Sequence, residues 1–483
     1  MKLSILIFLS ITISIVAGEI IITHENVVQL ADEFYGKYRL ESSKKEIEKL
    51  IYKEKIREYL PKVGVSYFGL KNKNENQSDN RFDEYRLTLQ QLLYDGGDNF
   101  RQKDLLMLSA KMEDEDRKLR AKRYKLQAFR NYLFCITNRY KKYLNLKIKE
   151  RSEFNYKIVI KENSLNLKRK IDALEYAIRL EEANSNLSKT LLLIEESDSE
   201  LLKLLGIEES TPIFSENILS DFIILPPPEE NSEIVDNPEI NRAKITLDKS
   251  KTELEIAQNH WKPKLFAGGY YGKNSTDALD TRHTNYGLDF SVVLPLGSST
   301  AQSSGRYGIQ EDGNGIQRIP GFGPQYVGQG ENSYNSGNFQ LFDNMSYSRK
   351  ILEGEVKTLD AKKNLHEVLL KAEAEKIKNS NRVKISFKTY KNNILKSLYR
   401  IEQLRHSSLL FKSGLISRLE YSNSEFEVFK SLIELSESIT DYLLNSFEYS
   451  ILFTGTDINQ YFYYRKQGAH LEIKKFLEDI GYE

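Results

Sequence analysis

Residues 286–296 have the sequence YGLDFSVVLPL, in which large apolar side chains occupy every second position. Alternation with a period of two is typical of a β-strand with one apolar and one polar face. The apolar positions are Tyr286, Leu288, Phe290, Val292 and Leu294. About ten residues with this pattern suit a strand that crosses a membrane with its apolar face toward lipid.

Three other segments alternate in the same way, so the sequence predicts two hairpins. The four predicted strands are residues 61–70, 85–94, 263–272 and 286–296, and the polar turns are residues 71–81 and 273–284. Two hairpins of a soluble sheet would give the same pattern. If the strands span a membrane, however, four cannot close a barrel, and lipid tolerates no open sheet edge. Copies of the chain would then have to pool strands, giving eight for two copies and twelve for three.

The chain contains a tandem duplication with an insertion in its second copy. Pro61 corresponds to Pro263, 202 residues later, whereas Asp172 corresponds to Glu420, 248 residues later. The second copy therefore holds 46 additional residues (248 − 202). They coincide with the stretch at about 298–340, which is rich in Gly, Ser, Asn and Gln. This composition leaves open whether the insertion is disordered, lines a lumen or binds the cell wall.

Two long segments, residues 97–206 and 343–454, predict helical hairpins. Neither Gly nor Pro occurs from residue 98 to residue 205, and Leu, Lys and Glu, which favour helix, are abundant. A helix of about 60 residues is about 90 Å long. Gly414 marks the turn of the second hairpin, and Asn166 takes the equivalent place in the first, because Asn also tolerates the left-handed conformation. Both a plain coiled coil and the wall of a water-filled tube fit this pattern.

The expected organisation is a signal peptide at residues 1–18, a first repeat at 19–235, a second repeat at 236–456 and a tail at 457–483. Residues 1–18 combine a basic start, an apolar run and small residues before Glu19, which are features of exported proteins. No later segment is apolar enough to predict a transmembrane helix. A mature protein integral to a membrane would therefore cross it as strands.

Composition and motifs exclude several function classes. The 70 Lys and Arg residues balance the 69 Asp and Glu residues, which gives no reason to expect a nucleic-acid partner. The single cysteine excludes a disulfide within the chain. The sequence holds no zinc-binding histidine pair, phosphate-binding loop or nucleophile motif. We therefore expect no enzyme activity, no cofactor and no metal site.

The ordered motifs of the chain resemble those of the TolC-type outer-membrane factor family. They are the Pro-Lys pairs at 61–62 and 263–264, LLYDGG at 92–97, NPEI at 237–240, LLG at 204–206 and GLISRLE at 414–420. The resemblance implies an α+β membrane protein with a periplasmic α-barrel, whose four transmembrane strands join a twelve-stranded barrel in a homotrimer. It also implies two protein partners, a periplasmic adaptor and an inner-membrane efflux pump or ABC transporter.

The resemblance also carries candidate site residues at the periplasmic ends of the helices. Asp172 and Glu420 match a ring of acids that narrows the channel, although a solvated helix face is the simpler interpretation of each. Asn423 stands where a further acid is usual. Lys168 matches a basic position that Ile416 occupies in the second copy. The turns that would contact the adaptor contain Asn166, Gly414, Leu415 and Ser417.

The predicted function is a passive channel for tripartite efflux or type I secretion, located in the outer membrane with a periplasmic extension. The alternative is a soluble periplasmic coiled-coil protein with a structural or adaptor role, whose hairpins form a small β-domain. The two differ in whether the apolar faces of the four strands meet lipid.

Overall fold

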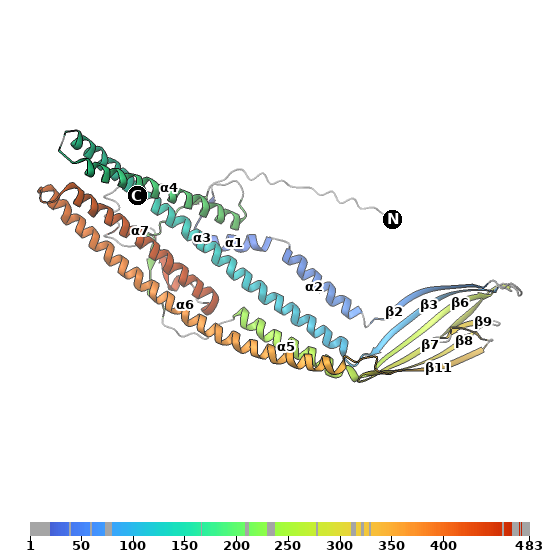
Figure 1. Ribbon diagram of the computed structural model, residues 1–483. Coiled ribbons are helices and arrows are strands. Elements are labelled where there is room, and N and C mark those ends of the chain that lie inside the picture. The colour runs from blue at the N-terminus through green and yellow to red at the C-terminus, as the bar shows by residue number, and fades with distance from the viewer. Residues whose placement is uncertain are drawn as a thin grey trace. The chain divides into compact units, whose positions relative to one another are not determined.

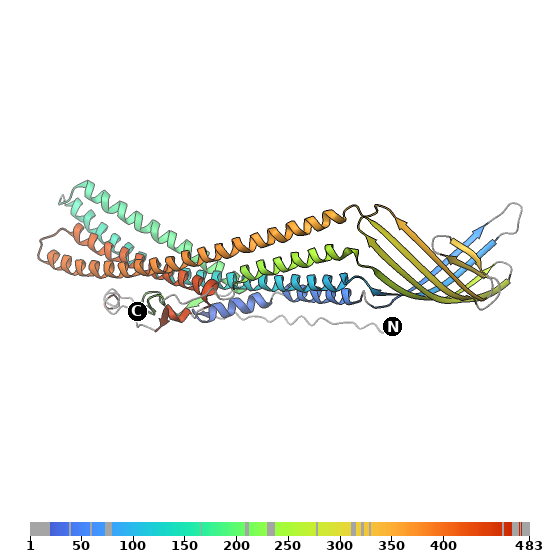
Figure 2. The same ribbon diagram turned by 90° about the horizontal axis from the view of Figure 1, so that it is seen from below.

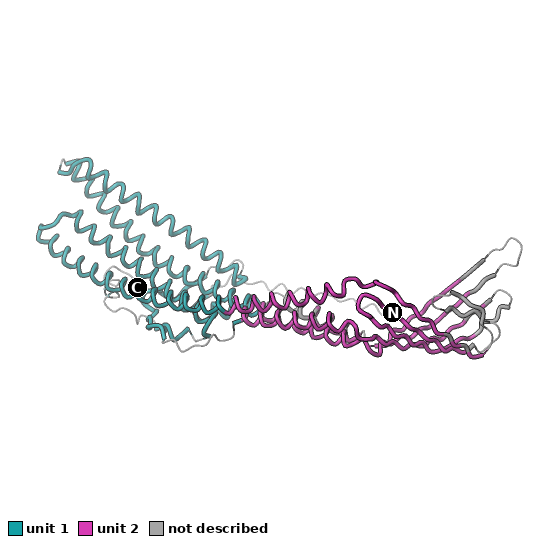
Figure 3. Tube along the Cα trace, turned by 60° about the horizontal axis from the view of Figure 1, so that its bottom comes forward, with its two compact units in different colours: residues 1–39, 117–237, 370–483 teal, residues 40–116, 238–369 magenta. Residues whose placement is uncertain are grey.

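The computed structural model describes most of the chain between residues 20 and 465. The described residues are 20–37, 40–57, 60–72, 80–165, 167–207, 212–228, 237–276, 279–310, 315–319, 323–327, 330–455 and 458–465, together with 473 and 475. The expected signal peptide, Asn166 and most of the tail lie outside them. The chain forms two compact units (Figure 3): unit 1 combines residues 1–39, 117–237 and 370–483, and unit 2 combines residues 40–116 and 238–369.

Unit 2 contains an antiparallel sheet of six strands in the order β11-β8-β7-β6-β3-β2 (Figures 1 and 2). The strands are β2 (Lys62–Asn72), β3 (Asn80–Tyr94), β6 (Lys264–Thr276), β7 (Leu279–Leu296), β8 (Ser299–Gln310) and β11 (Gly330–Gln340). Two shorter strands, β9 (Gly315–Ile319) and β10 (Gly323–Val327), pair with each other between β8 and β11 in the sequence.

The sheet has two strands more than the four that the sequence predicted. β8 and β11 lie in the Gly- and Ser-rich insertion, and β8 pairs with β7 from Leu296–Ser299 to Asn285–Gln310. Gly297 supplies the left-handed turn between them, with φ 64°. The insertion lacks the apolar alternation of the other strands, but its backbone can still continue the ladder of hydrogen bonds at the edge of β7. The large sheet therefore contains six strands, the four that the sequence predicted and two from the insertion.

Helices complete unit 2. They are α2 (Leu40–Arg57), α5 (Pro238–Gln258), the short η1 (Asn259–Trp261) and the first parts of α3 (Asp98–Ser164) and α6 (Tyr347–Lys412). α5 approaches α6 closely at Gly354, where an added Cβ would lie 3.0 Å from the side chain of Leu254. One turn later, the Thr358 hydroxyl donates to the carbonyl of Ser250 at 3.3 Å.

Unit 1 consists mainly of the remaining parts of α3 and α6 with α1 (Asn26–Lys37), α4 (Lys170–Leu205) and α7 (Arg418–Tyr449). Two small ladders join it: β1 (Ile20–Ile22) with β4 (Pro212–Phe214), and β5 (Phe222–Ile224) with β12 (Phe462–Tyr464). Short helical turns η2 (Ser450–Thr454) and η3 (Ile458–Gln460) follow α7. The core lies between α3 and α7, where the rings of Phe129 and Phe447 are 4.3 Å apart.

The long helices and the single large sheet confirm the expected fold class. Within the described residues, none of the helices carries an apolar stretch that is long enough to cross a membrane.

Candidate functional site

The sheet of unit 2 has two chemically different faces. Directly opposite residues of antiparallel strands point to the same side, and Val65, Leu87 and Tyr271 are linked in this way across β2, β3 and β6. This apolar face is exposed, and its large side chains are Val63, Val65, Tyr67, Tyr85, Leu87, Leu89, Tyr271, Leu288, Phe290 and Leu294. The alternation seen in the sequence therefore places a broad apolar surface on one side of the sheet.

The other face holds a cluster of polar side chains, which we call the polar-face cluster. Its members are Glu84, Arg86, Tyr270, Asn285, Asp289 and Arg306. Arg86 pairs with Glu84 at 2.5 Å and lies over the Tyr270 ring at 4.8 Å. Arg306 pairs with Asp289, with one hydrogen bond of 3.0 Å, and lies over the same ring at 4.7 Å. The guanidinium groups of both arginines thus lie over one tyrosine ring and form cation–π contacts with it.

At two glycines the absence of a side chain leaves room for members of the cluster to contact each other. Asn285 on β7 donates to Glu84 on β3 at 3.3 Å, passing β6 at Gly272, where an added Cβ would lie 2.3 Å from the Asn285 amide oxygen. At Gly287 a Cβ would lie 2.7 Å from the Tyr270 ring. Side chains at these positions would separate the charged groups from their partners.

Glu84 and Arg86 are 3% and 8% exposed, so their charges are stabilised by each other and by the cluster rather than by bulk water. The cluster contains two acids and two bases and is therefore close to neutral. Its members come from residues 84 to 306, far apart in the sequence. The alternation in residues 286–296 places Asp289 on the polar face of its strand. The sequence gives no indication, however, that Arg306 of β8 is its partner.

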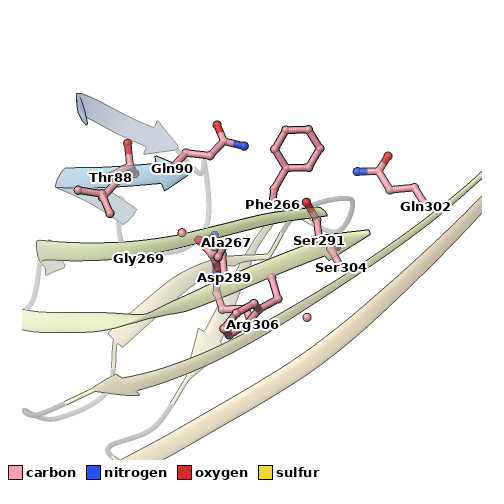
Figure 4. Close-up of a pocket in the computed structure, with 14 residues that line it drawn as sticks. Thr88, Gln90, Phe266, Ala267, Gly269, Asp289, Ser291, Gln302, Ser304 and Arg306 are labelled. Atoms are coloured by element: carbon pink, nitrogen blue, oxygen red, sulfur yellow. Dashed lines mark hydrogen bonds and ion pairs between the residues drawn. The ribbon is translucent and has the colours of Figure 1, made fainter. Parts of the chain in front are cut away.

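A polar hollow of about 360 Å³ lies on this face beside the cluster (Figure 4). Its side chains come from four strands and include Thr88, Gln90, Phe266, Asp289, Ser291, Gln302, Ser304 and Arg306. Apart from Phe266, these are neutral or paired polar groups, which are able to hydrogen-bond to water. Among the described residues no group of three or more His, Cys, Asp or Glu side chains could hold a metal ion. The arrangement is suited to lining a wet surface.

The predicted tip residues lie at the beginnings of α4 and α7 in unit 1. At α7, Ser417 N donates to the Glu420 carboxylate at 2.9 Å, and Glu420 N donates to the Ser417 hydroxyl at 3.2 Å. This reciprocal capping box stabilises the helix start. At α4, Asp172 accepts from Arg169 N at 3.4 Å and from the Arg169 guanidinium at 3.3 Å. Both candidate gate acids therefore cap their own helices.

The remaining predicted tip residues fall into two groups. Lys168, Gly414, Leu415 and Ser417 are exposed, and Gly414 takes the expected left-handed conformation with φ 74°. Asn423 is exposed as well, but it also accepts a hydrogen bond from Arg179, which pairs with Glu175 at 2.8 Å. Asn423 thus connects α7 to α4. Asn166 lies outside the described residues.

A second polar connection between the helices was not predicted. Asn155 on α3 donates to Ser422 on α7 at 2.8 Å, and Arg151 lies 3.7 Å from Glu425. Glu425 is buried, and burial raises the pKa of its carboxyl group, against the opposing effects of Arg151 and of a hydrogen bond from Tyr421. In the sequence these residues have ordinary helical spacing, which does not distinguish an interhelical contact from a solvated face.

Solved structures of outer-membrane channels share this architecture. The chain is 13% identical to the CmeC outer membrane channel of Campylobacter jejuni, with a TM-score of 0.65, over 90% of this chain and 88% of that one. For the outer membrane protein VceC of Vibrio cholerae the values are 10%, 0.64, 89% and 94%. For the MtrE outer membrane channel of Neisseria gonorrhoeae they are 12%, 0.63, 89% and 88%.

The chain has the fold of the TolC-type outer-membrane channels. The fold that the sequence motifs implied is thereby confirmed. No protein-family model and no curated protein matches the chain by sequence. At identities of 10–13% the likeness concerns the fold.

Proposed function

We propose that this chain is one protomer of an outer-membrane export channel with a helical extension in the periplasm. The two-faced sheet carries the proposal, because its broad apolar face suits lipid and its polar face suits a water-filled lumen. The polar-face cluster and the adjoining hollow would then line the lumen. The fold shared with channels from three bacteria, over about nine-tenths of the chain, supports the same function.

The protein would act as a passive conduit in a tripartite efflux or type I secretion system. Its partners would be two further copies of itself, a periplasmic adaptor and an inner-membrane pump or ABC transporter. These partners rest on the resemblance to the TolC-type family. A requirement for further copies also follows from the sheet, because unpaired strand edges are not tolerated in lipid.

The periplasmic tips of the helices remain the proposed constriction. Asp172, Glu420, Lys168 and Asn423 would border it, and the exposed turn at Gly414, Leu415 and Ser417 would contact the adaptor together with Asn166. Because Asp172 and Glu420 cap their helices, substitutions there would change tip stability as well as lumen charge. Asp172→Asn and Glu420→Gln retain polar atoms for capping while removing charge, and are therefore the suitable variants for testing ion selectivity.

The decisive experiment compares neighbouring residues on opposite faces of β7. Phe290→Arg places a charge on the apolar face, where lipid exposure near the membrane centre costs about 2–4 kcal/mol. Ser291→Arg places the same charge beside the polar hollow. We expect Phe290→Arg to abolish heat-modifiable oligomers in the outer-membrane fraction and Ser291→Arg to retain them with altered single-channel conductance.

Extraction of the native protein without detergent, from the periplasmic fraction and as a monomer, would contradict the proposal. Equal tolerance of both arginine variants would also contradict it, because the apolar face would then meet water or protein rather than lipid.

A further inference from the structure

The two ends of the sheet are suited to pairing with each other in neighbouring copies. β2 and β11 are the first and last strands of the sheet, and each is 11 residues long. Every neighbouring pair in the sheet is antiparallel, so that β2 and β11 run in opposite directions. Copies related by rotation about a membrane-normal axis keep their strand directions. β11 of one copy would therefore meet β2 of the next as a further antiparallel pair.

We infer that the membrane barrel closes between β11 of one copy and β2 of the next, so that the insertion contributes a third membrane-spanning hairpin to each protomer. This inference rests on the proposed channel function. It specifies the interface between copies, and it gives a trimer 18 strands, six from each chain, in place of the 12 that a closure through β7 would give.

The polar-face cluster fixes β8 to the rest of the sheet. Arg306 is the member that β8 contributes, and it holds both Asp289 on the adjacent β7 and the ring of Tyr270 on β6. Its side chain is 11% exposed. Separation of β8 from β7, which closure through β7 requires, would leave Asp289 without this partner. On β11, Ser336 in turn shares a hydrogen bond of 2.6 Å with Ser304 of β8.

On the added strands the apolar face is mixed: small and polar side chains, among them Ser303, Ser333 and Asn335, alternate there with a few large apolar ones. Tyrosines form a row across it: Tyr67 and Tyr85 are 4.9 Å apart, and Tyr271 lies opposite Tyr286. Tyr307 extends this row to β8 and is 44% exposed. Rows of aromatic residues are typical of membrane-spanning barrels, where they lie at the membrane–water interfaces.

β11 contributes a large apolar side chain at the opposite end of the same face. Phe339 is 56% exposed and lies opposite Ala301, which is itself paired with Leu294 of β7. Between the two ends, the added strands carry small residues, and Asn335 covers Gly305, where an added Cβ would lie 2.8 Å from the Asn335 amide oxygen. The outward surface of the third hairpin is thus apolar at Tyr307 and Phe339 and small or polar between them.

An 18-stranded barrel would be about 1.5 times as wide as a 12-stranded one, because barrel diameter grows roughly in proportion to strand number. Barrels of 16 to 18 strands leave an aqueous channel even when side chains point inward. In the wider barrel, the polar-face cluster of each copy would line a separate section of the lumen wall.

Cysteine pairs on the full-length protein test which strand meets β2. Val65→Cys on β2 is combined with a cysteine at Ser333, Asn335 or Gly337 of β11, which scans the possible registers. The matched controls combine it with a cysteine at Leu288, Phe290 or Val292 of β7. The native Cys135 is buried, and burial raises the pKa of its thiol to about 12, so that it does not react. We expect reducible covalent oligomers with at least one β11 position and with none of the β7 positions.

Deletion of residues 299–340 provides the reciprocal test, because it frees the edge of β7. In this background the combination of Val65→Cys with a β7 cysteine should produce the covalent oligomers that the full chain does not form. Crosslinks through β7 in the full chain, or oligomers that crosslink through neither strand, would overturn the inference. The proposed channel function would survive that result if the protein is still an outer-membrane oligomer, and would fail only if it is not.

Discussion

The two halves of the chain differ at the sheet and agree at the helical tips. The first half contributes the hairpin β2–β3, whereas the second contributes β6–β7 and then β8–β11. At the tips, α4 and α7 both begin with an acid that accepts from the backbone three residues earlier. The comparison shows that a sheet edge accepts additional strands with little requirement on side chains, whereas a helix start depends on particular local hydrogen bonds.

The largest expected effect concerns two directly paired residues, Val292 on β7 and Ser303 on β8. Both lie on the apolar face, so that Val292→Arg and Ser303→Arg should each cost about 2–4 kcal/mol if both strands meet lipid at this depth. The yield of outer-membrane oligomer and its resistance to heat in detergent measure the cost.

A tolerated arginine at 303 together with a disruptive one at 292 would show that β8 faces water, and would refute closure through β11. Gln302→Arg, on the polar face of β8, serves as the control for the added charge.

The next effect concerns the attachment of β8, which has no counterpart in the first half. Arg306→Met leaves Asp289 without its ion-pair partner. Because the Asp289 side chain is 35% exposed, solvent screening reduces the expected loss of stability to about 1–2 kcal/mol. The measurement is the unfolding midpoint of the oligomer in denaturant. Adding Asp289→Asn should recover part of the loss, and a purely additive double variant would show that the pair contributes no coupling.

A smaller effect should distinguish the two helix starts. Glu420→Ala removes one half of a reciprocal capping box, and caps of this kind are worth about 1 kcal/mol. Asp172→Ala should cost less, since Arg169 provides no hydroxyl acceptor for the helix backbone. Hydrogen exchange in the first turns of α4 and α7 measures both. Faster exchange at α4 than at α7 after the two substitutions would reverse the expected order.

The smallest effect concerns pH and occurs in the second half alone, because Ala177 lies 248 residues before Glu425. Burial raises the pKa of Glu425 in the folded protein, so that folding favours its protonated form. The stability of the α3–α7 contact is therefore greatest below the usual glutamate range and decreases as the pH rises through the raised pKa. Glu425→Gln should remove this dependence, as exchange at α7 followed against pH would show. An unchanged pH profile would exclude Glu425 as its cause.

Local patterns in the sequence were sufficient for much of the fold. The alternation in residues 286–296 predicted β7 and its apolar face, and the absence of Gly and Pro after residue 98 predicted the long helices. Gly414 marked a turn that the structure confirms with a left-handed backbone. At the candidate site the sequence pointed to Asp172 and Glu420, but their capping hydrogen bonds, the Arg151–Glu425 contact and the Asn423–Arg179 link depend on how helices meet.

The sequence by itself determined which residues form helices and which strands have an apolar face, because both follow from periodicity within a single segment. Only the tertiary structure decided that β8 and β11 lengthen the sheet and that Arg86, Tyr270 and Arg306 meet. The backbone of almost any extended segment can pair with an open strand edge, and whether it does so depends on an edge supplied from elsewhere in the chain. For this protein that edge is β7, which converts a Gly- and Ser-rich insertion into part of the sheet.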